Sequence, residues 1–299
     1  MRYLKRLTKV YKNSPKINYD EDSKFIIMSD VHRGDGGWAD SFSKNQNTFF
    51  AALTYYFNEN YTYIELGDGD ELWENRNIND IINAHSDAFW VLKKFHEKKR
   101  LHMIYGNHDI VKKYPFYVEK NLFQYFNQRD NEYCDLLRDI KIHEGLILQN
   151  KKNHNEIMLL HGHQVDFLNS DIWRVARFLV RYFWKPLENF CLHDVTRTAK
   201  NYKKKNDVAM KLSRWASKEN KIMVAGHTHR PMFPKPGKPP YFNDGSCVHP
   251  RCITGIEISG GEITLIKWAI KSNSEKMLKV EREILAGPNK INDYFEKAR

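Results

Sequence analysis

The 299-residue sequence lacks any apolar segment long enough to cross a membrane. No hydrophobic run approaches the roughly 20 residues that span a bilayer, and residues 1–15 lack the apolar stretch of a secretory signal. Only four cysteines are present, without the paired spacing of a zinc ribbon. No internal repeat or low-complexity tract occurs. These absences argue against integral membrane proteins, secreted disulfide scaffolds and repeat proteins, and we expect a cytoplasmic protein with reduced thiols.

The composition is that of one folded domain. Hydrophobic residues make up 41% of the chain and charged residues 28%, which is too apolar for global disorder. A length of 299 residues is enough for one large core, so we expect a single domain over residues 1–299. The chain is basic, with 48 Lys and Arg against 37 Asp and Glu. A formal net charge of +11 favours anionic substrates or surfaces.

Five short polar clusters each follow an apolar run that is typical of a buried strand. The runs are residues 25–28, 63–66, 101–105, 157–160 and 222–225. Polar side chains therefore recur at the carboxyl ends of strands, where open α/β sheets build their sites. Asp, His and Asn are ligands that divalent metals accept. The clusters are Asp30-Val31-His32, Gly67-Asp68, Gly106-Asn107-His108-Asp109, His161-Gly162-His163 and Gly226-His227-Thr228-His229.

These clusters resemble the signature of calcineurin-type metallophosphoesterases, which is D-x-H, G-D-x-x-[DE], G-N-H-[DE], a motif containing His, and G-H-x-H. All five stand in the family's order and extend over about residues 24–260. The resemblance implies an α/β fold of the metallophosphoesterase type, a sandwich of two mixed β-sheets flanked by helices. It also implies a phosphoric ester hydrolase that holds two divalent metals.

The resemblance implies two ligand sets that share Asp68. In the fourth motif, His163 is a second candidate beside His161, which ends the strand and matches the family position. We expect manganese because the set is rich in oxygen donors and lacks thiolates, although Fe, Zn, Ni and Co also suit such ligands. One set is Asp30, His32, Asp68 and His229; the other is Asp68, Asn107, His161 and His227.

The same resemblance gives roles to three further residues. Two cations lower the pKa of a bound water, so that hydroxide attacks phosphorus in line. His108 would protonate the leaving oxygen, with Asp109 orienting its imidazole. Arg33 would donate to a substrate phosphate as a bidentate group. We expect Asp70 and Glu71 to support the turn that follows the second motif rather than to bind metal.

The segments between the motifs fit the layered fold. Apolar residues at helical spacing predict helices over 46–59 and 78–98, which would connect the first three strands. Residues 252–259 and 262–270, separated by Gly260-Gly261, predict a β-hairpin. Residues 231–240 contain five prolines and are therefore expected to form a loop beside the site.

A basic and aromatic block lies between the fourth and fifth motifs. Residues 171–218 contain twelve Lys or Arg and four Asp or Glu, in a helical pattern. We expect residues 168–218 to form a helical cap beside the metals. Arg174, Arg177 and Arg181 share one helix face and are the expected substrate-binding residues. The alternative is that the aromatic residues pack the cap onto the body and the charges are only solvated.

Within the superfamily, the chain is similar to the branch that contains UDP-2,3-diacylglucosamine hydrolases, which also carry a helical insertion after the fourth motif. Residues 29–32 and the stretch 66–73, L-G-D-G-D-E-L-W, carry this likeness. Those hydrolases commonly have Arg at the position of His108, and residues 34–40 and 245–251 do not match them. The likeness therefore extends to the chemistry and the cap rather than to that substrate.

The first nineteen residues form a basic N-terminal extension. They contain six Lys or Arg and no acid, with Leu4, Leu7 and Tyr11 at helical spacing. One interpretation is a short amphipathic segment that rests on an anionic membrane, so that the protein is membrane-peripheral. The others are packing on the domain and disorder.

The sequence therefore predicts a dinuclear metal-dependent phosphoesterase. The expected substrate is a small or lipid-linked anionic phosphate compound, cleaved at a monoester, diester or pyrophosphate bond. A nuclease and a protein serine/threonine phosphatase of the same superfamily are the alternatives. The nuclease is less favoured, because no extended basic groove for a single strand is evident in the sequence. The sequence does not fix the oligomeric state.

Overall fold

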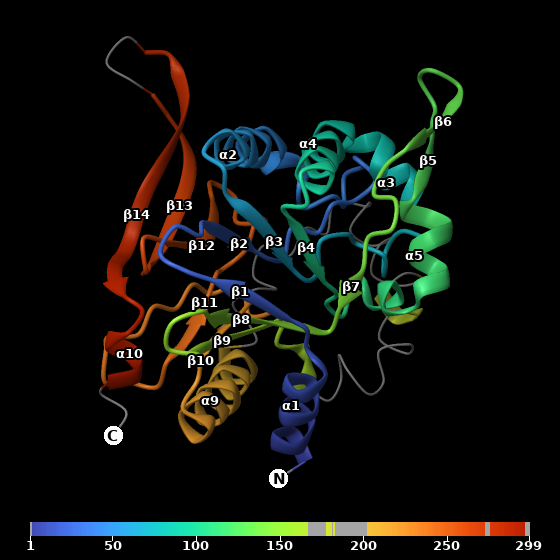
Figure 1. Cartoon of the computed structure of the whole chain (residues 1–299). Helices are drawn as coiled ribbons and strands as arrows, with labels where there is room; N and C mark the ends of the chain where they lie inside the picture. Colours follow the sequence, from blue (N-terminus) through green and yellow to red (C-terminus); the bar gives the residue numbers. More distant parts are fainter. Residues whose placement is uncertain (1, 167–177, 181, 183–201, 273–275, 297–299) are drawn as a thin grey trace.

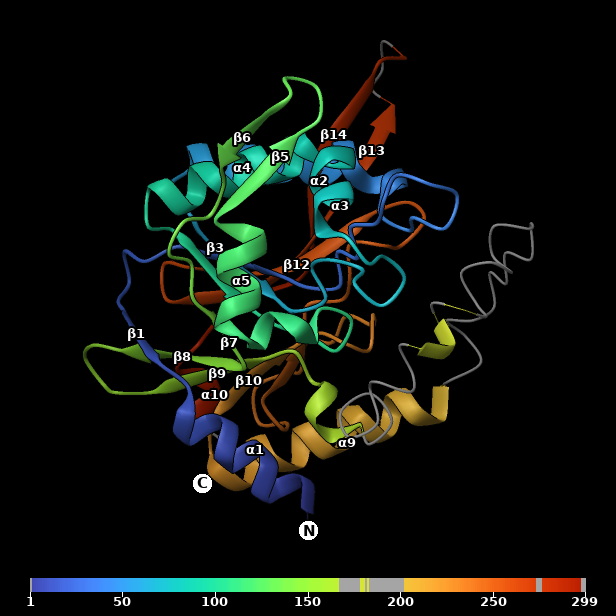
Figure 2. The ribbon, with the colours of Figure 1, turned by 90° about the vertical axis from the view of Figure 1, so that its right-hand side faces the viewer.

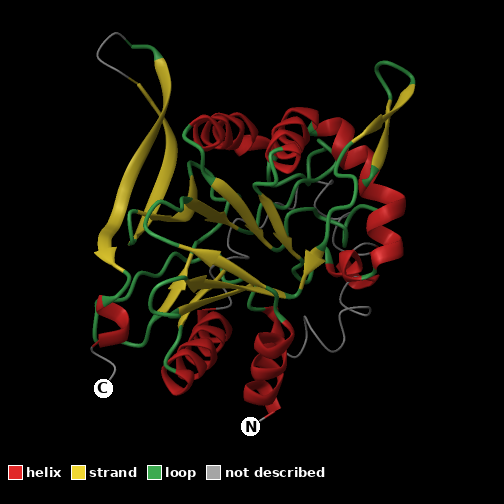
Figure 3. Cartoon of the chain, in the orientation of Figure 1, coloured by secondary structure: helices red, strands yellow, loops and turns green. Residues whose placement is uncertain are grey.

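The computed structural model describes residues 2–166, 178–180, 182, 202–272 and 276–296. Two β-sheets stack face to face, and helices cover their outer faces (Figure 1). Figure 3 shows this layering, with the strands in yellow between two groups of red helices. The predicted α/β sandwich of two mixed sheets is confirmed.

The larger sheet has seven strands in the order β14-β13-β12-β2-β3-β4-β7. Strands β2, β3, β4 and β7 run parallel, whereas β12, β13 and β14 are joined in antiparallel pairs. Three of the predicted strands are therefore neighbours whose carboxyl ends lie at one edge. The strands are β2 (Phe25–Met28), β3 (Thr62–Leu66), β4 (Leu101–Ile104), β7 (Ile142–His143), β12 (Ile253–Ser259), β13 (Glu262–Ser272) and β14 (Leu278–Lys290).

The smaller sheet has five strands in the order β1-β8-β9-β10-β11. Strands β9, β10 and β11 are parallel, β8 is antiparallel to β9, and β1 is parallel to β8. Residues 16–19 of the N-terminal segment thus belong to this sheet. The strands are β1 (Lys16–Tyr19), β8 (Gly145–Asn150), β9 (Glu156–Leu160), β10 (Ile222–Ala225) and β11 (Tyr241–Asn243).

The expected helix over 46–59 is present as α2 (Gln46–Asn58), but the helix expected over 78–98 is two helices. These are α3 (Ile78–Ala84) and α4 (Ser86–Glu97), separated by His85. The His85 ring lies 2.7 Å from Asp40 Oδ2 and 3.0 Å from Gln46 Oε1, so contacts outside the helix hold it at the break. Remaining elements on this side are α5 (Pro115–Leu122), the hairpin of β5 (Gln124–Asn127) and β6 (Glu132–Asp135), and the short helices η1 (Ser43–Asn45) and η2 (Ile110–Lys113).

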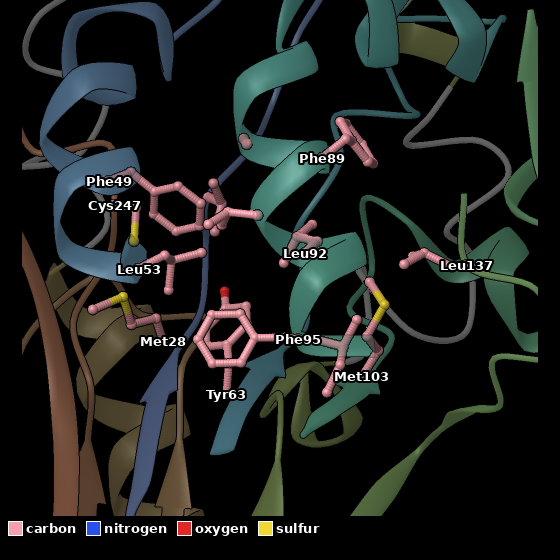
Figure 4. Packing of buried hydrophobic residues seen from close by; sticks show 14 of the residues in the cluster. Met28, Phe49, Leu53, Tyr63, Phe89, Leu92, Phe95, Met103, Leu137 and Cys247 are labelled. Carbon is pink, nitrogen blue, oxygen red and sulfur yellow. The ribbon is translucent and has the colours of Figure 1, made fainter. Parts of the chain in front are cut away.

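A large apolar cluster joins α2 and α4 to the seven-stranded sheet. Figure 4 shows Phe49 and Leu53 of α2 and Phe95 of α4 packed around Tyr63 of β3. All four side chains are fully buried. Each such side chain contributes about 2 kcal/mol by leaving water, so this cluster fixes the two helices to the sheet and keeps the strand ends in register. A second cluster fills the space between the sheets.

Two helices cover the outer face of the five-stranded sheet (Figure 1): α1 (Arg2–Asn13) and α9 (Tyr202–Glu219). Leu7 and Val10 of α1 and Leu212 and Trp215 of α9 are buried in one cluster with β8, β9 and β10. Trp215 Nε1 donates to Thr8 Oγ1 at 3.1 Å. The apolar side of α1 is therefore covered by protein, as the interpretation of packing on the domain predicts.

Two further expectations about local structure are confirmed. Strands β12 and β13 pair in an antiparallel hairpin that turns at Gly260-Gly261, with Ser259 opposite Glu262. The proline-rich segment 231–240 is a loop. The last elements are η3 (His163–Val165) and α10 (Asp293–Glu296). None of the helices in the described residues has both the length and the apolar character needed to cross a bilayer.

Candidate metal centre

The five motifs meet where the carboxyl ends of strands from both sheets converge. Strands β2, β3 and β4 supply the first three motifs, and β9 and β10 supply the last two. Backbone hydrogen bonds join the motif loops: Asp30 N donates to Gly67 O at 3.0 Å, and Gly226 N donates to His161 O at 3.0 Å. The two sheets therefore build one site together.

The expected donors of the first set lie close together. His229 Nε2 is 3.0 Å from Asp30 Oδ1, and His32 Nε2 is 3.8 Å from the same oxygen. His32 Nε2 is also 3.9 Å from Asp68 Oδ2, the shared carboxylate. Asp30, His32 and His229 thus form one group of donor atoms that could hold a metal ion.

The second set is built around the other side of Asp68. Its Oδ2 lies 3.1 Å from His161 Nε2, and Asp68, His161 and His227 form a second group of converging donors. Asn107 is buried beside them at the end of β4. His163, the alternative in the fourth motif, is absent from the converging groups in the described residues; its ring centroid is 5.5 Å from that of His161.

Five of the seven expected ligands have a left-handed backbone conformation. The φ angles are +50° at Asp30, +49° at His32, +51° at Asp68, +65° at His227 and +54° at His229. Residues other than glycine seldom adopt positive φ, and each instance costs about 1 kcal/mol or more. Each of these residues follows a strand, and the left-handed backbone turns its side chain toward the other donors.

Two glycines of the motifs are required by this close approach. A Cβ atom at Gly67, where φ is +94°, would lie 2.7 Å from the His161 ring. A Cβ atom at Gly106 would lie 2.1 Å from Asp68 Oδ1. A side chain at either position would push apart the donors of the second set.

Four buried atoms of the expected ligands make no hydrogen bond with any residue that the structure describes. They are Asp30 Oδ1, His32 Nε2, Asn107 Oδ1 and His161 Nε2. Buried polar atoms are normally paired, because losing water without a partner is costly. These atoms therefore fit divalent cations as their missing partners.

The protonation of these groups suits cation binding. Burial disfavours the charged form of Asp30, but the His229 and His161 imidazoles outweigh it and hold the pKa of this carboxyl well below its usual value. Burial likewise opposes a charged His161, yet the Asp68 and Asp30 carboxylates raise the pKa of its imidazole to about 9. A cation bound there would take the place of that proton.

Glu71 holds two histidines of the site. Its Oε1 lies 2.7 Å from His108 Nδ1 and its Oε2 lies 2.7 Å from His32 Nδ1. The indole of Trp73 stacks on the His108 ring, with centroids 4.3 Å apart. Glu71 therefore orients His108, and the expectation that Asp109 does so is wrong.

Asp109 instead connects the loops of the second and third motifs through buried hydrogen bonds. Its carboxylate accepts from Gly106 N at 2.7 Å and Gly69 N at 3.2 Å, and it binds Lys112 Nζ at 2.8 Å. Lys112 also binds Asp70 at 2.6 Å. All three ionic side chains are buried, so this network supports the loops and leaves substrate to other groups.

The expected contact of Arg33 with a substrate phosphate is also wrong. Its guanidinium is fully buried, with both Nη atoms on Glu65 at 2.8 and 2.9 Å and Nε on Asp70 at 2.7 Å. The donors that would bind phosphate bidentately are already used. Arg33 therefore has a structural part in the loop between the first and second motifs.

Several polar residues near the donors were not identified from the sequence. Asp166 Oδ2 lies 3.4 Å from His227 Nε2 and 2.8 Å from Lys204 Nζ. The next residue, Lys205, is close enough to Asp30 and Arg230 to interact with their charges. The first turn of α9 thus reaches the metal centre with cationic side chains.

A further carboxyl group, that of Asp244, lies behind Asp30. Ser29 Oγ is within hydrogen-bond distance of both Asp30 Oδ2 and Asp244 Oδ1, the latter at 2.8 Å. Burial and the Asp30 carboxylate raise the pKa of Asp244 well above its usual value. Asp244 follows strand β11 directly, so its place after a strand was the signal that could have identified it.

The three arginines expected to bind substrate, Arg174, Arg177 and Arg181, lie outside the described residues. Parts of the predicted cap within the described residues do contact the site loops. Val180 packs near Trp73, and Tyr182 contacts Arg76. A pocket is bounded by His32, Glu71 and residues of the stretch 34–41.

Comparison with known proteins gives a family match over the region of the motifs. The family model of calcineurin-like phosphoesterases matches residues 23–231. A search of curated proteins finds none that matches the chain. Among solved structures, Vps29 of Chaetomium thermophilum aligns over 88% of this chain and 96% of its own at 11% identity, with a TM-score of 0.38. Similarity at that level supports no conclusion about fold or function.

Proposed function

Because the chain belongs to the calcineurin-like phosphoesterase family, we propose that it is a metal-dependent phosphoesterase with a dinuclear centre. The observation that carries the proposal is the set of unpaired buried donor atoms at Asp30, His32, Asn107 and His161. Members of this family are generally hydrolases that bind divalent metals. Manganese is the metal we propose, because carboxylate, amide and imidazole donors make up the site and thiolates do not.

The proposed ligands are Asp30, His32, Asp68 and His229 for one cation, and Asp68, Asn107, His161 and His227 for the other. When bound, two divalent cations lower the pKa of a coordinated water and offset negative charge on phosphate oxygens. The protein's own part is to hold seven donors rigidly by the hydrogen bonds and turns described above.

His108 is the proposed proton donor to the leaving oxygen. Its side chain is partly exposed, at 23%, while the Glu71 carboxylate beside it is buried. Glu71 holds Nδ1, which leaves Nε2 of the imidazole as the nitrogen that can face a substrate. Stacking on Trp73 fixes the plane of the ring.

The charges around the centre support a particular class of substrate. Lys205 and Arg230, at the start of α9 and after the fifth motif, offer positive charge near Asp30, whereas Asp35, Asp40 and Glu74 line the pocket beside His32 and Glu71. A second anionic group of the substrate would therefore be bound toward α9. We propose a small or lipid-linked compound with a phosphodiester or pyrophosphate bond, in preference to a simple monoester.

The test is metal analysis of the purified protein together with a substrate screen. We expect about two metals per chain and manganese-dependent hydrolysis of a pyrophosphate-linked or diester substrate. The screen includes p-nitrophenyl phosphate, bis(p-nitrophenyl) phosphate, nucleotide diphosphate conjugates, phospholipids, a phosphopeptide and single-stranded DNA. Turnover of DNA alone would make the protein a nuclease, and turnover of the phosphopeptide alone a protein phosphatase. Full metal content without turnover of any compound would refute the enzymatic proposal.

A variant pair tests the role of His108. We expect His108→Asn to keep its metals and to slow turnover by about 10² or more, most for poor leaving groups. His154→Asn is the matched control, since His154 is exposed in the turn after β8. Loss of metal from His108→Asn would show that His108 is a ligand and would overturn its assignment as proton donor.

A further inference from the structure

Most of the protein's net positive charge lies on two helices. Helix α1 carries a net charge of +5 and α9 a net charge of +4. Together these 30 residues account for +9 of the formal net charge of +11, so the rest of the chain is close to neutral. The excess positive charge is therefore local to one part of the molecule, which indicates a basic surface for an anionic partner.

On α1 the exposed charges form one stripe. The exposed basic residues Arg2, Lys5, Lys9 and Lys12 are spaced by three and four positions, which places them on one face of the helix. The opposite face holds the buried Leu7 and Val10. The helix therefore has an apolar side fixed to the sheet and a basic side that faces solvent.

Helix α9 repeats this arrangement. Its exposed basic residues are Lys203, Arg214 and Lys218, on the side opposite the buried Leu212 and Trp215. Both helices cover the same face of the five-stranded sheet, so their outer sides point the same way (Figures 1 and 2). We call these seven residues the basic face: Arg2, Lys5, Lys9, Lys12, Lys203, Arg214 and Lys218.

Negative charge is nearly absent from this surface. The only acids of α1 and α9 are Asp207 and Glu219, and both are partly buried. The Asp207 side chain is 45% exposed and is paired with Lys211 at 2.5 Å. Within these two described helices, the exposed charge is thus predominantly positive.

We propose that the basic face docks the protein on an anionic lipid bilayer. The apolar residues of α1 are packed against protein, so the helix does not insert, and attraction between Lys or Arg and lipid headgroups holds the protein at the membrane surface. Such binding is reversible and weakens as salt screens the charges. The proposal does not depend on the proposed function, since no metal ligand belongs to the basic face.

A bilayer fits this surface better than a nucleic acid does. Five of the seven residues are Lys, which acts as a point charge, whereas Arg gives the bidentate contacts typical of nucleic-acid recognition. Tyr3 and Tyr11 of α1 are not exposed, and Trp215 of α9 is buried, so these rings offer no stacking surface for bases.

The position of α9 connects this surface to the metal centre. Lys203, on the basic face, is next to Lys204, which binds Asp166 beside His227. A protein docked through the basic face therefore holds the α9 side of the centre close to the headgroups. A lipid-linked substrate would reach the site without leaving the membrane.

The test is co-sedimentation of the full chain, without added metal, with phosphatidylcholine vesicles that contain or lack phosphatidylserine. We expect binding only when phosphatidylserine is present, and release at high salt. Lys5→Gln, Lys9→Gln and Arg214→Gln combined should lower the partition coefficient about a hundredfold, because each basic side chain accounts for about fivefold, or about 1 kcal/mol.

The matched control is the triple variant Lys98→Gln, Lys120→Gln and Lys141→Gln. It removes the same charge from exposed positions outside α1 and α9, at the end of α4, in α5 and just before β7. Thermal melts of both variants check that the fold is intact. Equal loss of binding in the two triple variants would overturn the assignment to the basic face. No binding to phosphatidylserine vesicles, or salt-sensitive binding to duplex or single-stranded DNA instead, would overturn the membrane proposal.

Discussion

Replacing Arg33 by Met tests whether this residue supports the site or binds substrate. The guanidinium makes three hydrogen bonds to Glu65 and Asp70, and all three side chains are buried. Asp70 keeps Lys112 as a partner at 2.6 Å, but Glu65 is left as a buried carboxylate beside Tyr63 alone. Removing one member of a buried ion pair costs about 3–5 kcal/mol. We expect the free energy of unfolding to fall by about that amount.

The assay is urea denaturation of the parent protein, of the single variants Arg33→Met and Glu65→Leu, and of their combination. Arg33→Met combined with Glu65→Leu removes the unpaired carboxylate and should recover a large part of the loss, so the two substitutions should be strongly non-additive. Lys94→Met, on α4 and away from this network, is the control for loss of one positive charge. Unchanged stability of Arg33→Met together with a raised KM would refute the structural role and restore the expected phosphate contact.

Three further predictions concern the site and its support. Cation removal with a chelator should lower the melting temperature, and manganese at about 100 times its dissociation constant should restore about 2.7 kcal/mol, read by scanning fluorimetry; no shift with any divalent cation would contradict the ligand assignment. Glu71→Gln should reduce activity or metal affinity by about 10–100-fold, because the carboxylate orients both His32 and His108, whereas Glu74→Gln serves as its control. Glu156→Gln should cost about 1–2 kcal/mol at neutral pH. Burial disfavours a charged Glu156, but Lys16, Lys221 and Tyr11 outweigh it and lower the pKa of this carboxyl to about 2. Because the pKa of Glu156 is lower in the folded state, its carboxylate stabilises the fold fully above pH 4.5, the usual value, and this stabilisation is lost as the pH falls toward 2. The difference in unfolding free energy between Glu156→Gln and the parent should therefore vanish near pH 2. A difference that grows in acid would contradict this ion cluster.

The fold and the donor positions could be predicted because both depend on local signals. Short apolar runs specified strands such as β2 and β10, and polar residues after them marked the strand ends that converge. The single helix expected over 78–98 is a different case. Its apolar periodicity continues through His85, and only the side-chain contacts of His85 with Asp40 and Gln46 show the break.

The roles of individual polar residues could not be derived from adjacency. Arg33 follows His32, but His32 has a left-handed backbone conformation, so adjacency in this loop does not place the two side chains on the same side. His32 faces the donors while Arg33 forms a bridge beside Asp70, behind them. Glu71 and Asp109 are both near His108 in sequence or space, and side-chain direction alone decides that Glu71 reaches the imidazole. Asp166 and Asp244 belong to no motif and are identified by their contacts.

The junction of two sheets at the site has a consequence for folding. Asp30 and His227, whose carboxylate and backbone amide are hydrogen-bonded at 2.8 Å, are separated by 197 positions in the chain. During synthesis, most of the chain must emerge before the last donors can join the first, and closing so long a loop is slow. Metal binding is therefore a late step in folding, because the donors come together only when the second sheet packs on the first. Chelation should accordingly speed amide exchange first at the seam between β2 and β10, ahead of the helices on the outer faces.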